Sequence, residues 1–450
     1  MEKQGLVWSR VFSALGLLAL GVSGLLWWRG YSYGAAGRAA ALLSIALFAA
    51  LGLRFVPRWV DFWSPGGGEE RLAPAGEEPP GMALRIFAAL LALDAFVLLS
   101  AWLLRRLMGT EGGFVETLEF WTCADSRHYL DIARDWYLSE GSRDRLVQLV
   151  FLPGYPLLVR LGMLVTGDAL LAGLLTSALC FAAAGVLLYR LLRLDVEHRT
   201  ALRGLLFLCL MPGSFFFAAP MSESLFLLLC LGCLYLARKG RWALGCLCGA
   251  LAAFTRSLGL TLLAPLLLEL VHDYARGRAG GRRTALRALA LLLVPLGFAA
   301  YLWVNWRVSG DPFRFLVYQR EHWGQRMGLF FNTAAYQTEQ AAAYFGASRE
   351  YFWGLWLPNL LCSFGSLSLL AASAPRLRAS GTAWAIGYFV LAIGPTWLLS
   401  APRYLAALPV LPAALALLTE KRGRFALAAG LLAPAWTMYF LAFLQRWQVW

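Results

Sequence analysis

The chain has 450 residues, of which 60% are hydrophobic and 15% are charged. Apolar runs long enough to cross a bilayer recur along it, which excludes a soluble globular protein. The net charge of +14 would suit nucleic acid, but the basic residues cluster in short loops between apolar runs, where they determine membrane topology. We therefore expect membrane lipids, and no nucleic acid, as partners.

The apolar runs predict an all-α polytopic membrane protein, because backbone amides in hydrocarbon have to be satisfied within each segment. The stretch 57–84 is rich in Gly, Pro and Glu and is predicted to be a flexible cytoplasmic linker. It divides an N-terminal two-helix addition, 1–56, from a transmembrane domain, 85–450. About 13 spanning helices are expected near residues 11–28, 39–56, 85–104, 168–192, 203–218, 222–238, 242–255, 257–272, 286–306, 352–371, 382–399, 404–419 and 424–444.

Arginine-rich loops set the expected orientation. The positive-inside rule assigns them, and the N-terminus, to the cytoplasmic side. Two large loops, 105–167 and 307–351, then fall on the outer face, together with the short turns 255–257 and 400–403. The proline-containing segment 151–160 would invert the later topology if it crossed the membrane, so it is interpreted as a helix lying in the interface. The arginine-rich loops lie near residues 193–203, 238–241, 276–287, 376–378 and 421–424.

Cysteine and histidine give little indication of a metal. The pair Cys230-x-x-Cys233 lies in an apolar run without neighbouring His or acidic residues, which favours packing over metal binding. The outer loops contain no Asp-x-Asp pair or His cluster at ligand spacing. We expect neither a metal nor another cofactor.

Five blocks of polar and aromatic residues stand out in or beside the outer loops. The blocks are 125–133 with 153–156; Pro212 with 222–226; 255–257 with Gly259; 310–313 with Gln319 and Trp323; and 402–404. In this order they resemble the PIG-V family of GT-C glycosyltransferases, the second mannosyltransferase of GPI-anchor assembly and its bacterial relatives. The resemblance spans most of residues 85–420. The sequence departs from the family pattern at Ala124, Met221 and Leu258, where an aromatic, a Tyr and an Asn are usual.

The resemblance implies a GT-C-like fold and an inverting transfer of α-mannose from a polyprenyl- or dolichyl-phosphate donor to a glycolipid or glycan acceptor. The implied active site lies on the extracytoplasmic or luminal face, in a bacterial inner membrane or, in a eukaryote, the ER membrane. Asp125 matches the family's first-loop aspartate and is the predicted base that deprotonates the acceptor hydroxyl. The competing interpretation is that Asp125 caps the helix that begins there.

Arg256 and Arg403 are predicted to bind the donor phosphate, because a guanidinium among apolar helices is costly unless it has a partner. Snorkelling to the membrane interface is the alternative for each. His128 is predicted to contact the same phosphate or Asp125, or else to anchor its loop.

The predicted substrate-binding residues are Glu223, Asp131, Tyr155, Trp323 and Tyr404. Glu223 would bind acceptor hydroxyls or hold an outer-face arginine. Asp131 and Asp135, four residues apart, would otherwise pair with nearby arginines. The three aromatic side chains would bind sugar or lipid, or belong to an interfacial belt.

Two other classes of function remain open at this point. A transporter or flippase for a lipid-linked sugar would need polar residues at midplane depth and perhaps an internal repeat. A non-catalytic scaffold of a glycosylation complex would keep its function without the carboxylate of Asp125. Within the enzyme class, glucose and arabinose are alternatives to mannose, and the acceptor and the oligomeric state are left open.

Overall fold

The computed structural model describes residues 2–64, 78–138 and 140–450. Within these residues every regular element is a helix. Eight helices of the described part are long and apolar enough to cross a bilayer. The prediction of an all-α polytopic membrane protein is therefore confirmed, whereas about 13 full spans were expected.

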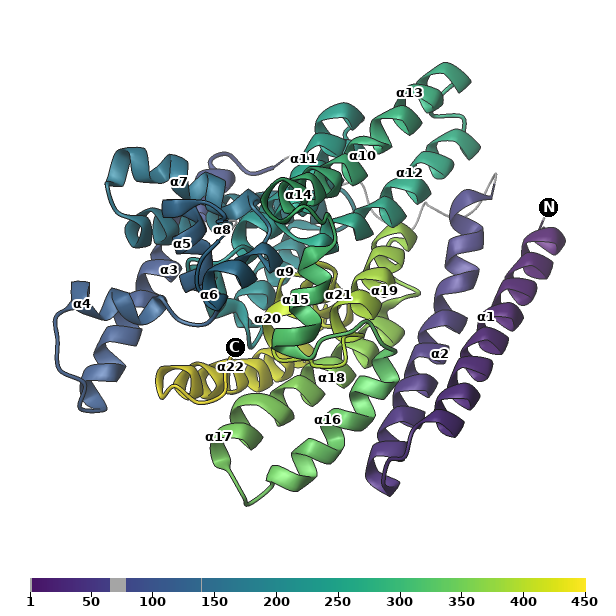
Figure 1. Cartoon of the computed structure of the whole chain (residues 1–450). Coiled ribbons are helices and arrows are strands. Elements are labelled where there is room, and N and C mark those ends of the chain that lie inside the picture. The colour runs from purple at the N-terminus through teal and green to yellow at the C-terminus, as the bar shows by residue number, and fades with distance from the viewer. Residues whose placement is uncertain (1, 65–77, 139) are drawn as a thin grey trace.

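The N-terminal addition is a pair of antiparallel helices at one edge of the molecule, α1 (Glu2–Gly30) and α2 (Ala35–Trp63) (Figure 1). At one end of the pair, Trp27 Nε1 donates a hydrogen bond of 2.9 Å to Asn332 Oδ1. At the other, the ring of Phe62 stacks 4.0 Å from that of His272. α2 continues beyond the predicted linker boundary at residue 57, and the rest of that prediction falls mostly on residues 65–77, outside the described ones.

The first of the two large loops follows a long helix and consists of short helical pieces. Its last piece, α7, has 13 residues, or roughly 20 Å, which is shorter than the roughly 30 Å hydrocarbon core, as an interfacial helix requires. The elements are α3 (Met82–Leu107), α4 (Phe114–Leu118), η1 (Glu119–Trp121), α5 (Asp125–Asp135), α6 (Arg143–Leu146), η2 (Val147–Val150) and α7 (Gly154–Thr166).

The central helices pack around α10, which contacts α8 and α11 along its length. α10 runs from Glu223 to Arg238, so these two residues lie roughly 22 Å apart at opposite helix ends. The elements are α8 (Ala169–Leu192), α9 (His198–Leu210), η3 (Ser214–Ala218), α10 (Glu223–Arg238), α11 (Trp242–Thr255), η4 (Ser257–Leu262), α12 (Leu263–Ala275), α13 (Gly281–Leu291) and α14 (Leu293–Ser309).

The C-terminal part begins with the second large loop and ends in a long apolar helix. Its elements are α15 (Arg314–Trp323), α16 (Phe330–Tyr344), α17 (Arg349–Tyr351), the π-helical turn η5 (Phe352–Trp356), α18 (Leu357–Ser373), α19 (Ala379–Ile393), α20 (Ala401–Ala406), α21 (Val410–Leu418) and α22 (Arg422–Leu444).

Two predicted spans, 203–218 and 404–419, are interrupted. The first stops at Leu210, before Pro212 and Gly213, and the second splits into α20 and α21. The first break lies against α20, because a Cβ on Gly213 would lie 2.7 Å from the backbone nitrogen of Arg403. The second break follows that contact, between Ala406 and Val410. Both spans were predicted as continuous helices from their apolar character, although Pro212-Gly213 and Pro409 mark the breaks in the sequence.

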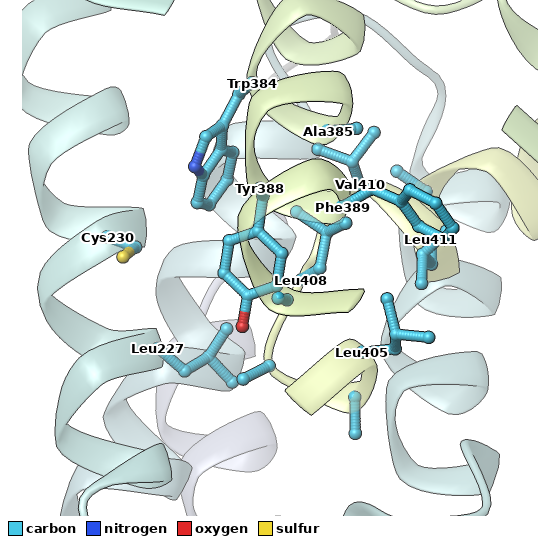
Figure 2. Close-up of a cluster of buried hydrophobic side chains, with 14 of the residues drawn as sticks. Leu227, Cys230, Trp384, Ala385, Tyr388, Phe389, Leu405, Leu408, Val410 and Leu411 are labelled. Carbon is cyan, nitrogen blue, oxygen red and sulfur yellow. The ribbon is translucent and has the colours of Figure 1, made fainter. Parts of the chain in front are cut away.

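Apolar side chains fill the space next to these breaks. Figure 2 shows Trp384 and Tyr388 of α19 between Leu227 and Cys230 of α10 and the leucines around α20 and α21. The Tyr388 hydroxyl donates a hydrogen bond of 2.7 Å to the carbonyl of Tyr404. This core therefore fixes the backbone next to Arg403.

Arginine-rich turns gather at the Arg238 end of α10. Arg238 Nη1 lies 2.5 Å from Asp195, and Arg203 donates a hydrogen bond of 2.8 Å to the carbonyl of Thr419. Arg376 lies 3.2 Å from Glu420. Several of the arginine-rich turns that were predicted to lie on one side of the membrane therefore contact one another.

Candidate active site

A cavity of about 360 Å³ lies at the end of the helices where α10 begins. Its wall comes from segments far apart in the sequence, which include both large loops and the turns after α11 and before α20. The lining residues are Ala124, Asp125, His128, Tyr129, Val150, Phe151, Leu152, Thr255, Arg256, Ser257, Gln319, Trp323, Gln325, Leu399, Ser400, Arg403, Tyr404 and Trp450. Six of the predicted site residues are among them.

Asp125 is the first residue of α5 and faces this cavity. The residue at the N-cap position is Ala124, whose φ of 47° and ψ of −128° are strained for a residue with a side chain. The Asp125 carboxylate is directed to another element, since its Oδ2 accepts a hydrogen bond of 2.6 Å from Arg403 Nη2. Its side chain is 31% exposed, so the carboxylate is open to the cavity while it is paired.

Glu223 lies beneath the cavity wall and holds both arginines. Its Oε1 accepts a hydrogen bond from Arg256 Nη1 and lies 3.4 Å from Arg403 Nε. Asp125, Glu223, Arg256 and Arg403 form a charge quartet in which two carboxylates balance two guanidiniums. Burial on its own disfavours charge on Arg403, but the carboxylates of Asp125 and Glu223 more than offset this and hold its pKa well above the usual value.

Aromatic and polar neighbours fix the two guanidiniums. The ring centroid of Tyr404 lies 5.3 Å from the Arg256 guanidinium carbon and 5.2 Å from that of Arg403, within cation–π range. Met221, one of the departures from the family pattern, places its sulfur 3.2 Å from Arg403 Nη1. Ser222 Oγ accepts a hydrogen bond of 3.1 Å from Arg256.

The opposite wall of the cavity is aromatic. The ring of His128 is stacked 4.7 Å from that of Phe151, and the edge of Trp323 approaches the same phenylalanine at 6.2 Å. Tyr129, one turn from Asp125, hydrogen-bonds Ser222 at 2.9 Å. Burial is the main cause that raises the pKa of the Tyr129 phenol, so it stays protonated at neutral pH.

Close backbone contacts join the sequence blocks that form the site. A Cβ on Gly154 would lie 2.9 Å from the Cα of Thr255, so only glycine allows α7 to lie against the residue before Arg256. Gly213 has the same function against Arg403. The blocks are therefore held by packing as well as by charge.

Two of the predicted site residues lie away from the cavity. Asp131 faces a cluster of charges, 3.6 Å from Arg134 and 3.9 Å from Arg145. The buried Tyr155 donates a hydrogen bond of 2.9 Å to the carbonyl of Gly173. For Asp131 these are the contacts of the alternative stated above, pairing with nearby arginines. Tyr155 is fully buried between helices, which is not the position of an interfacial belt. Glu223 sits below the wall and makes the contacts of its own alternative, which is to hold outer-face arginines.

The structure also places residues in the cavity to which sequence reasoning gave no role. Gln325 and Ser400 line the wall, as do Phe151 and Trp450. The local sequence around Phe151 and Ser400 gives no signal for this, because their position depends on contacts between distant segments. Gln319 and Tyr129 occur in the recognised blocks, and helical spacing from Asp125 would have placed Tyr129 on the same face.

Comparison with known proteins points to one family. Residues 111–299 match the family model described as mannosyltransferase (PIG-V). The predicted resemblance is confirmed over these residues. The PIG-V segment contains Asp125, His128, Glu223 and Arg256, whereas Arg403 lies beyond it.

Two curated relatives carry the name GPI alpha-1,6-mannosyltransferase 2. The mouse protein (Mus musculus) is 32% identical over 202 residues, which is 39% of this chain and 38% of the relative. The rat protein (Rattus norvegicus) is 35% identical over 167 residues, 34% of this chain and 31% of the relative. The matches thus span less than two fifths of the length of each relative.

A solved structure, ArnT from Cupriavidus metallidurans bound to undecaprenyl phosphate, aligns with a TM-score of 0.46 and 18% identity. The alignment covers 79% of this chain and 75% of that protein.

Proposed function

We propose that this protein is an inverting glycosyltransferase that moves a sugar from a polyprenyl- or dolichyl-phosphate carrier to a hydroxyl group of a lipid-linked glycan. The sugar in this proposal is mannose, and the product is α-linked. The observation that carries the proposal is the Asp125–Arg403 pair, 2.6 Å apart, in one cavity with Arg256. A base for the acceptor and cations for the departing phosphate are what this reaction needs.

Each member of the quartet has a defined task in this reaction. Asp125 takes the proton of the acceptor hydroxyl as its oxygen attacks the anomeric carbon. The bond between that carbon and the phosphate oxygen breaks, and its electron pair stays on the phosphate. Arg256 and Arg403 stabilise the charge that develops there, and Glu223 keeps both guanidiniums in position.

Mannose and the face of the membrane are supported by different observations. The names of the mouse and rat relatives support transfer of α-mannose to a glycolipid of the GPI type. The gathering of arginine-rich turns at the Arg238 end of α10 supports a cytoplasmic position for that end. The cavity, at the Glu223 end, then faces the extracytoplasmic or luminal side of a bacterial inner membrane or an ER membrane.

The first test is transfer by the purified protein. Given radiolabelled polyprenyl-phosphate mannose and a membrane glycolipid extract, the protein is expected to form a labelled glycolipid. Asp125→Asn should reduce the rate by at least about 100-fold, the lower range for loss of a general base. Asp135→Asn removes the same charge from the same helix, where Asp135 pairs with Arg145 at 2.8 Å, and should retain transfer.

Full transfer by Asp125→Asn would eliminate the base assignment. Movement of the intact donor across a vesicle membrane, with no labelled glycolipid formed, would favour a lipid-linked sugar transporter instead. The face is tested separately, with epitopes inserted at the exposed Glu111 and Lys421. In sealed inner-membrane vesicles with the cytoplasmic face outward, only the Lys421 epitope should be accessible to antibody.

A further inference from the structure

One oxygen of the carboxylate predicted to act as the base is already engaged by an arginine. Asp125 Oδ2 accepts its 2.6 Å hydrogen bond from Arg403 Nη2, the same guanidinium that the donor phosphate would use. The other nitrogens of that guanidinium face protein, with Nη1 3.2 Å from the Met221 sulfur and Nε 3.4 Å from Glu223. The Arg403 side chain is only 4% exposed, compared with 31% for Asp125. A ligand therefore reaches Arg403 where Asp125 now binds it.

The charge of the quartet leads to the same conclusion. Two carboxylates and two guanidiniums cancel, so a phosphodiester that enters the cavity adds a negative charge while both guanidiniums of the quartet are already paired. One carboxylate therefore has to leave its guanidinium when the phosphate binds. Glu223 is enclosed between both guanidiniums and is 1% exposed, whereas Asp125 lies in the cavity wall. Asp125 is the carboxylate that can move.

We propose that the donor phosphate and Asp125 compete for Arg403, so that binding of the lipid phosphate releases the Asp125 carboxylate to the acceptor hydroxyl. This rests on the function proposed above. Before the donor binds, Oδ2 of the Asp125 carboxylate is engaged by Arg403. After it binds, this oxygen too is free when the acceptor attacks.

The competition also connects the two halves of the chemical step. The acceptor oxygen forms a bond to the anomeric carbon, the bond from that carbon to the phosphate oxygen breaks, and the acceptor proton moves to Asp125. Protonated Asp125 carries no charge and no longer competes for Arg403. The guanidinium is then fully available to the phosphate, which has just gained its second negative charge.

Linkage makes this competition measurable without any transfer. If phosphate weakens the hold of Arg403 on Asp125, then removal of the Asp125 charge has to strengthen phosphate binding. The probe is farnesyl phosphate, a short polyprenyl phosphate monoester, titrated calorimetrically into the purified full-length protein. Asp125→Asn is expected to bind it about tenfold more tightly than the wild type, which corresponds to about 1.4 kcal/mol.

Two controls separate the competition from a general gain of positive charge. Asp125→Glu keeps the carboxylate and should bind farnesyl phosphate as the wild type does. Asp135→Asn makes the same charge change on α5, in a residue that pairs with Arg145, and should leave the affinity unchanged within about twofold. Farnesol, which lacks the phosphate, should bind the Asp125→Asn and wild-type proteins equally.

Equal or weaker binding of farnesyl phosphate by Asp125→Asn would overturn the proposal. If that variant does not fold, as judged by gel filtration, Asp125→Ser removes the same charge and takes its place. The result is distinct from the test of function. If the wild type transfers mannose but Asp125→Asn binds farnesyl phosphate no more tightly, only the competition is rejected. If Asp125→Asn binds farnesyl phosphate more tightly but the wild type transfers no mannose, only the enzymatic function is rejected.

Discussion

Replacement of Glu223 by Gln tests whether one buried carboxylate holds both arginines. Glu223 Oε1 contacts Arg256 and Arg403, and all three side chains are buried, with 2%, 15% and 4% of their surfaces exposed. Removal of one partner of a buried ion pair costs about 3–5 kcal/mol. Glutamine keeps an oxygen that accepts a hydrogen bond, so we expect the lower value, about 3 kcal/mol.

The matched control is Glu269→Gln. Glu269 is also buried and forms an ion pair with Arg378 at 2.6 Å. It lines a separate pocket together with Arg238, the last residue of α10, and so lies at the end of α10 opposite the candidate active site. Both variants should lower the midpoint of thermal unfolding in detergent by roughly 6 °C, taking about 2 °C per kcal/mol for a chain of this size. Only Glu223→Gln should also reduce mannose transfer at the permissive temperature, by more than about tenfold.

Two results would refute this reasoning. A Glu223→Gln protein with wild-type stability and transfer would show that Glu223 does not hold the guanidiniums. An equal loss of transfer in Glu269→Gln would show that lower stability alone, and not the lost position of the guanidiniums, explains the effect.

Three further substitutions test how the site and the N-terminal helices are held. Gly213→Ala should reduce transfer and lower the midpoint of thermal unfolding, because the added Cβ would lie 2.7 Å from the backbone nitrogen of Arg403. The control is Gly365→Ala, which should do neither because the space around Gly365 is open. Phe62→Ala should lower the free energy of unfolding by about 3 kcal/mol, since its ring stacks 4.0 Å from an imidazole of the main body; urea unfolding followed by circular dichroism measures this loss. Ala124→Gly should raise the same free energy by about 1 kcal/mol, because glycine tolerates a φ of 47°; an unchanged or lower value would contradict the strain.

The sequence predicts the elements of this fold well where hydrophobicity alone decides them. All of the predicted runs are largely helical, and α10 and α11 match residues 222–238 and 242–255 to within one residue. The breaks at Gly213 and near Leu408 are missed. Both lie at helix-breaking residues, Pro212-Gly213 in the first and Pro409 in the second. The close approach of Gly213 to the backbone of Arg403 joins distant segments, and neither segment on its own indicates it.

For the site, helical spacing from Asp125 explains which residues of α5 face the cavity. With about 100° per residue, His128 and Tyr129 lie within roughly 60° of Asp125, and both line the wall. Asp131 lies roughly 120° away and contacts Arg134 and Arg145 instead. The spacing therefore places Asp131 on a different face of α5 from Asp125, and a role for Asp131 in substrate binding stays a prediction.

What the sequence does not give is the pairing within the quartet. Asp125 and Arg403 are 278 positions apart, and the same residues would fit a site in which each arginine is free for the substrate. In the structure each arginine is bound by a carboxylate, which is expected because an unpaired guanidinium is costly among apolar helices. A site that has to hold two cations in a dry environment before its anionic substrate arrives needs anions of its own. In this chain Glu223 holds Arg256, and Asp125 and Glu223 share Arg403. The proposed base is thus itself one of those anions, and in the proposed competition the donor phosphate takes its place on Arg403.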